Sequence, residues 1–72
     1  MQTLVFNTTT KEVVLYSDRK STSDTIASFK NISTVKIYEG YYEIMKKTSD
    51  ETNSAIPVMR VPISNTNMLI EK

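Results

Sequence analysis

The feature that most constrains the fold is the run of residues around Gly40, the chain's single glycine. Glycine accepts the positive φ that a tight turn needs, so Glu39 and Gly40 can form a two-residue turn between paired strands. Such a turn aligns four cross-strand pairs: Tyr38 with Tyr41, Ile37 with Tyr42, Lys36 with Glu43, and Val35 with Ile44. Pairs of these types contribute roughly 0.2–1 kcal/mol each. The sequence therefore predicts a β-hairpin over residues 34–47.

Alternation along this hairpin separates an inward face from an outward face. The inward face is expected to hold Val35, Ile37, Tyr42 and Ile44. The outward face is expected to hold Thr34, Lys36, Tyr38, Tyr41, Glu43 and Met45. We therefore expect the first set to form the centre of the core and the second set to face solvent or a partner.

A second hairpin is predicted near the N-terminus, where residues 3–6 and 12–16 alternate on either side of a polar loop at 8–11. The expected pairs are Phe6 with Val13, Val5 with Val14, Leu4 with Leu15, and Thr3 with Tyr16. The apolar face of this hairpin consists of Leu4, Phe6, Val13 and Leu15. A slip of one residue would turn that face outward, so the register is well specified.

Residues 24–30 fit two structures. A short helix could begin after Ser21 or Ser23 as the N-cap, with Ile26 and Phe29 on one side. Thr25 and Ile26 are β-branched, and isolated helices of this length are marginal in water, so we favour a strand.

The last third of the chain indicates two more strands. Residues 55–63 alternate but include Pro57 and Pro62. Proline confines a strand to a sheet edge, a strand start or a bulge. A turn cluster at 64–67 precedes a short strand at 68–70. The polar stretches 17–23 and 48–54 are expected to be loops, the second of them mobile.

Together these elements predict an all-β fold, a small antiparallel sheet of about six short strands rolled into a barrel or sandwich, with residues 1–72 as one domain. The alternative is an α+β fold with one short helix near residues 24–30. A chain of 72 residues buries only about 60% of its unfolded surface, and without cysteine it has no disulfide to support it. We therefore expect a homodimer or a higher oligomer.

The composition argues against catalysis. The chain has no histidine and no cysteine, so the ordinary pairs of base and nucleophile cannot be assembled. Asp50 and Glu51 are adjacent in a predicted loop and would not converge on one substrate atom. With a single glycine there is no glycine-rich phosphate loop. We expect a non-enzymatic protein with no catalytic residues, cofactor or metal.

Charge and hydropathy narrow the possible partners. The formal net charge is +1 and the sequence has no clustered basic face, which argues against nucleic-acid binding. No apolar run has the length of a transmembrane segment, and the N-terminus lacks the pattern of a signal peptide. We expect a cytoplasmic protein that does not engage a membrane.

The outward hairpin face is the candidate binding surface. Tyrosine, methionine and arginine are enriched in protein interfaces, and Tyr38, Tyr41 and Met45 lie near one another on this face beside Lys36. Arg60 is expected to complete its rim. The sequence therefore predicts a protein-binding module with an unidentified protein partner. Two alternatives stay open: a single-strand nucleic-acid binder that stacks bases on Tyr38 and Tyr41, and a structural subunit of a larger assembly.

In general character the chain resembles the small accessory proteins of bacteriophages, since it is short, rich in threonine, asparagine and lysine, and free of histidine and cysteine. No motif carries this resemblance. It implies an inhibitor that acts by binding and blocking a protein of the host.

Overall fold

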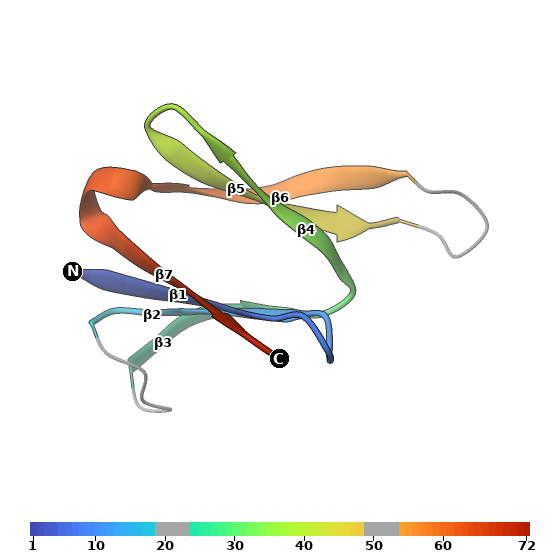
Figure 1. Cartoon of the computed structure of the whole chain (residues 1–72), viewed down its shortest axis with the longest axis horizontal. Coiled ribbons are helices and arrows are strands. Elements are labelled where there is room, and N and C mark those ends of the chain that lie inside the picture. The colour runs from blue at the N-terminus through green and yellow to red at the C-terminus, as the bar shows by residue number, and fades with distance from the viewer. Residues whose placement is uncertain (19–23, 49–53) are drawn as a thin grey trace.

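A computed structural model of the chain describes residues 1–18, 24–48 and 54–72. These residues form seven strands and one 3-10 turn: β1 (Gln2–Asn7), β2 (Glu12–Tyr16), β3 (Thr25–Phe29), β4 (Ile32–Tyr38), β5 (Tyr41–Lys47), β6 (Ala55–Pro62), η2 (Ile63–Asn65) and β7 (Thr66–Glu71). The strands lie in two separate sheets (Figure 1). Sheet A has the order β3-β2-β1-β7, and sheet B has the order β4-β5-β6. The predicted all-β class is confirmed, and its form is sandwich-like because the sheets do not close into a barrel.

The ambiguous segment at 24–30 is a strand, so the helical alternative is wrong. β3 pairs antiparallel with β2, and the register shifts between Leu15 and Tyr16. Leu15 faces Ala27 while Tyr16 faces Thr25, so Ile26 is the extra residue of a bulge. Pairing with a buried neighbouring strand, together with β-branched residues, favours the extended form over an isolated helical turn.

The N-terminal hairpin has the predicted register, with Phe6 opposite Val13 and Leu4 opposite Leu15. Its loop is closed by Asn7, whose side-chain Oδ1 accepts hydrogen bonds from the backbone of Thr9 and Thr10, both at 3.0 Å. The apolar face predicted for this hairpin is confirmed, since all four of its side chains are buried: Leu4, Phe6, Val13 and Leu15.

One pairing departs from the expected antiparallel pattern. β7 runs parallel to β1, with Leu4 beside Met68 and Phe6 beside Ile70. The turn η2 carries the chain from sheet B to sheet A, where β7 forms an edge (Figure 1). The last strand is also longer than the predicted segment 68–70.

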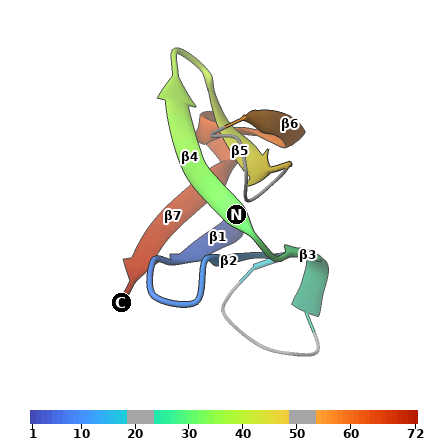
Figure 2. The same ribbon diagram turned by 90° about the vertical axis from the view of Figure 1, so that its right-hand side faces the viewer.

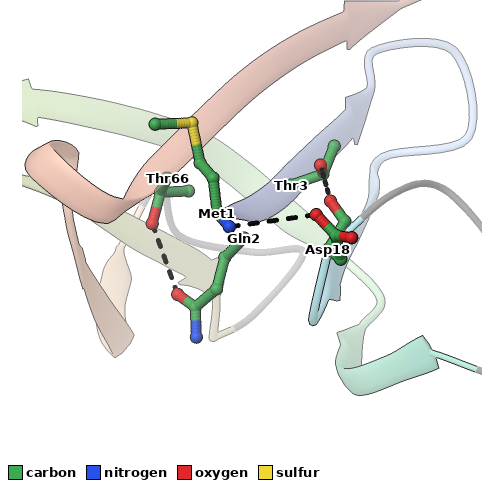
Figure 3. Close-up of polar contacts among 5 residues, drawn as sticks. All are labelled: Met1, Gln2, Thr3, Asp18 and Thr66. Atoms are coloured by element: carbon green, nitrogen blue, oxygen red, sulfur yellow. Dashed lines mark hydrogen bonds and ion pairs between the residues drawn. The ribbon is translucent and has the colours of Figure 1, made fainter.

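Polar contacts hold the first residues of β1 on both sides (Figure 3). Thr3 donates its hydroxyl to the backbone carbonyl of Asp18, and the N-terminal amine lies 3.8 Å from the Asp18 carboxylate. On the other side, the Thr66 hydroxyl lies 3.3 Å from Oε1 of Gln2. β1 is thus connected to the end of β2 and to the start of β7.

The central hairpin has the predicted register from Val35–Ile44 to Tyr38–Tyr41. Gly40 has a φ of 93°, so the turn uses the conformational freedom that glycine provides. The backbone N–H of Ile63 donates to the Gly40 carbonyl at 3.1 Å, which connects the tip of the hairpin to η2. The strand that contains Pro57 and Pro62 is β6, an edge of sheet B, as predicted.

The core lies between the two sheets. Its buried cluster takes side chains from both: Leu4, Phe6, Val13 and Leu15 from sheet A, and Ile32, Ile44 and Val61 from sheet B. Val35 and Tyr42 are half-buried against this cluster, as expected. Ile37 is a correction, because it was expected in the core and is 67% exposed. It lies on an edge strand, one residue before the last position of β4, beyond the part of sheet B that sheet A covers.

Most of the two predicted loops, together with Asp50 and Glu51, lie outside the described residues. Within residues 1–18, 24–48 and 54–72, no helix has the length and apolarity that crossing a bilayer would require.

Candidate functional site

The outer face of sheet B brings all five predicted site residues onto one surface. Residues paired across neighbouring strands point to the same side of a sheet. The registers of β4, β5 and β6 therefore define three rows on this face: Tyr38–Tyr41–Pro62, Lys36–Glu43–Arg60 and Thr34–Met45–Pro57. We call these nine residues the outer face of sheet B.

The first row contains a stacked pair of tyrosines. The ring centroids of Tyr38 and Tyr41 are 5.1 Å apart, and the ring planes differ by 26°. Tyr38 on the edge strand is 40% exposed, whereas Tyr41 on the central strand is partly buried. Such pairs add about 0.5–1.5 kcal/mol beyond the area that they bury. The exposed aromatic surface therefore belongs mostly to Tyr38.

Arg60 lies over the Tyr41 ring, with its guanidinium carbon 5.2 Å from the ring centroid. Tyr41 sits on the central strand, between Tyr38 on β4 and Arg60 on β6. Its ring is thus flanked by an aromatic side chain from one neighbouring strand and by a cation from the other. The three side chains form a continuous stack across sheet B.

The stack is fixed by a charged hydrogen bond. Arg60 donates its Nε hydrogen to Oε2 of Glu43 at 2.7 Å. The Glu43 side chain is only 8% exposed and the Arg60 side chain is 64% exposed, so the carboxylate is the buried partner. This hydrogen bond, with smaller contributions from Tyr41 and from the charge of Glu43, raises the pKa of Arg60 above its usual range. Arg60 is therefore a permanent cation on this face.

Lys36 is the neighbour of Glu43 on β4, and Arg60 is its neighbour on β6. The sequence predicts a pair between Lys36 and Glu43, and the two residues are indeed cross-strand neighbours. Among the described residues, however, the ion pair of Glu43 is made with Arg60, and Lys36 is exposed and has no ion pair. From the sequence, Arg60 is predicted only as part of the rim and not as the partner of Glu43. No two-residue turn connects β5 and β6, so the sequence does not determine the register between them.

Met45 is a correction to the expected surface. It lies on the outer face but is only 8% exposed, so it offers little area to a partner. Its position explains this, because it is on the central strand with Thr34 and Pro57 as neighbours on the two sides. The exposed part of the candidate site thus consists of Tyr38, Arg60 and Lys36, with Tyr41 between them.

No protein-family model matches the chain, and comparisons with curated proteins and with solved structures gave no match either.

Proposed function

We propose that the protein is a small non-enzymatic binding module that contacts another protein through the outer face of sheet B. The observation that carries this proposal is the stack of Tyr38, Tyr41 and Arg60, which is exposed at both ends and held by the buried carboxylate of Glu43. Tyrosine and arginine are among the residue types most often found to dominate binding energy at interfaces.

Pre-organisation supports the same proposal. A flexible arginine normally loses side-chain freedom on binding, at about 0.5–1.5 kcal/mol for each immobilised side chain. Arg60 is already ordered by its bond to Glu43 and by its contact with Tyr41. A partner would therefore meet a surface that needs little further ordering.

The alternative of a single-strand nucleic-acid binder is less well supported. Bases stack on open aromatic faces, whereas the Tyr41 ring is flanked by Tyr38 and Arg60. Only the far side of Tyr38 is left for a base. The net charge of +1 adds little attraction for phosphates.

The test is affinity capture from a lysate of the source organism. The bait is the full chain, compared with a variant that combines Tyr38→Ala and Arg60→Ala. The matched control is Asn67→Ala, an exposed residue on β7 in the other sheet. We expect a protein that the wild type and the control retain and the double variant loses. Equal retention by all three folded proteins contradicts the proposal, and a shift of labelled oligonucleotides at low salt would favour the nucleic-acid alternative.

The expected homodimer, the role of a structural subunit and the inhibitory action of a phage-type accessory protein stay predictions. Sedimentation velocity tests the first, since a monomer at high concentration contradicts it. If a captured partner is an enzyme, its activity in the presence of the protein tests inhibition.

A further inference from the structure

The two edges of sheet B differ in their ability to accept another strand. Edge strands expose backbone groups that a further strand can pair with. β6 contains Pro57 and Pro62, which have no N–H to donate. β4 contains no proline in its range Ile32–Tyr38. Figure 2 shows β4 at one edge of sheet B, next to β5. The first residue of β4 is already engaged, because the Ile32 N–H donates to the Lys11 carbonyl at 2.9 Å. Within the described part of the chain, the rest of β4 is therefore the accessible edge of sheet B.

The turn at Gly40 determines which backbone groups point away from the sheet. In a hairpin with a two-residue turn, the residues that flank the turn exchange hydrogen bonds, and every second residue along the strand does the same. Tyr38 and Lys36 thus direct their backbone groups toward β5, opposite Tyr41 and Glu43. The N–H and C=O groups of Val35 and Ile37 are directed to the outside, where they are available to an added strand.

The side chains along this edge indicate what such a strand would carry. On the core-facing side, Ile37 is paired with Tyr42 on β5 and is still 67% exposed. On the outer side, Lys36 has no anionic partner among the described residues, because Glu43 is bonded to Arg60. The edge thus presents an uncovered apolar side chain on one face and an unneutralised cation on the other.

We propose that an extended acidic segment of a partner protein adds to β4 as a fourth strand of sheet B. The segment would place a carboxylate beside Lys36 on the outer face and an apolar side chain beside Ile37 on the core-facing side. This inference rests on the proposed function, for which it names the class of partner. A second copy of β4 fits less well, because Lys36 is the one charged residue in Ile32–Tyr38 and would gain no anion.

Synthetic peptides test the charge preference. The probe is a short acetylated peptide in which valine alternates with threonine around a central glutamate, and its control has lysine in place of the glutamate. We expect the lysine peptide to bind the wild-type protein roughly three- to tenfold more weakly in fluorescence anisotropy. Lys36→Glu should reverse that preference. Equal binding of the two peptides, or no binding of either, overturns the proposal.

A backbone substitution tests strand addition itself. Ile37→Pro removes one outward-facing N–H, whereas Ile37→Thr removes the same apolar side chain and keeps that N–H. We expect the proline variant to bind the glutamate peptide about tenfold more weakly than the threonine variant. If the proline variant does not fold, amide hydrogen exchange of the wild-type protein tests strand addition instead. The Val35 and Ile37 amides should exchange quickly in the free protein and slowly with peptide, and unchanged exchange contradicts the proposal.

Two further outcomes separate this inference from the proposed function. If the cellular partner is lost by the variant with Tyr38→Ala and Arg60→Ala but kept by Ile37→Pro, the outer face binds the partner and strand addition is overturned. The second outcome is that the Lys36→Thr variant dimerises while the wild type binds neither peptide. Lys36 then serves only to prevent β4 from pairing with β4 of a second copy, and strand addition is again overturned.

Discussion

Arg60 on β6 donates a hydrogen bond to Glu43 on the neighbouring strand β5. The guanidinium is largely exposed to solvent, and the carboxylate is largely buried. The pair is therefore asymmetric: the cation keeps much of its hydration, while the anion has lost most of its own. A carboxylate in this position depends on its partner, because an unpaired buried charge is unfavourable. Arg60 thus supports the fold and at the same time presents a cation to a partner.

This asymmetry predicts a non-additive pair of mutations. Arg60→Ala leaves the Glu43 carboxylate buried without its partner, whereas Glu43→Gln removes the charge and keeps the shape of the side chain. We expect Arg60→Ala to destabilise the wild type more than it destabilises the Glu43→Gln variant. Urea unfolding of the four proteins in this cycle measures the difference, and additive effects would show that the charge of Glu43 contributes nothing to its interaction with Arg60.

The raised pKa of Arg60 predicts how its contribution depends on pH. A group whose folded pKa lies above its unfolded value stabilises the fold fully below the unfolded pKa, and the stabilisation is lost as pH rises through the folded pKa. Both pKa values of Arg60 lie far into the alkaline range. The difference in stability between wild type and Arg60→Gln should thus not decline from neutral to mildly alkaline pH. A clear decline in urea unfolding over that range contradicts the assignment.

The tyrosine stack predicts a measurable coupling between Tyr38 and Tyr41. Replacing either ring by leucine removes the stacking and keeps an apolar side chain at the position. The double-mutant cycle should give a coupling energy of about 0.5–1.5 kcal/mol in urea unfolding. A coupling of zero would mean that the two rings pack independently, and the exposed surface would then lack the order that the binding proposal assumes.

The turn predicts that Gly40 tolerates a D-residue better than an L-residue. Its φ of 93° is unfavourable for L-amino acids, and beyond the adjacent residues no atom lies within 4 Å of where a Cβ would be, so the effect of a methyl group is purely conformational. We expect Gly40→Ala to destabilise the protein by about 1–2 kcal/mol. A synthetic chain with D-alanine at this position should be at least as stable as the wild type in thermal unfolding. Equal destabilisation by both alanines would contradict the turn geometry.

Two isoleucines test the boundary of the core. Ile44 is fully buried, and Ile37 on the neighbouring strand is largely exposed. Ile44→Val should lower the free energy of unfolding by about 0.5–1.5 kcal/mol. Ile37→Val should change it by less than about 0.5 kcal/mol. Similar losses at the two positions would mean that Ile37 is covered in solution, as in a self-associated state.

The features that can be predicted from the sequence are those that neighbouring residues determine. The registers of both hairpins follow from short turns and from complementary pairs, so the burial of Leu4 and Ile44 is predicted correctly. The candidate face is found for the same reason, because Lys36, Tyr38 and Tyr41 belong to one hairpin.

The features that escape prediction depend on contacts between distant segments. Alternation shows on which side of β4 Ile37 lies, but it does not show how far the opposite sheet extends. Met45 is buried because β5 is the central strand of sheet B, and that position is set by the pairing with β6. The bond between Glu43 and Arg60 depends likewise on a register across a long connection.

The parallel pairing of β1 with β7 has a consequence for the order of folding. Residues 2–7 are synthesised well before their neighbours at 66–71. The hairpin of β1 and β2 can form early from local contacts. The other edge of β1 has no strand to pair with until β7 has been synthesised. Such long-range pairing slows folding and leaves nascent chains open to misassembly. The strand that completes sheet A thus also sets the earliest moment at which the whole fold can become stable.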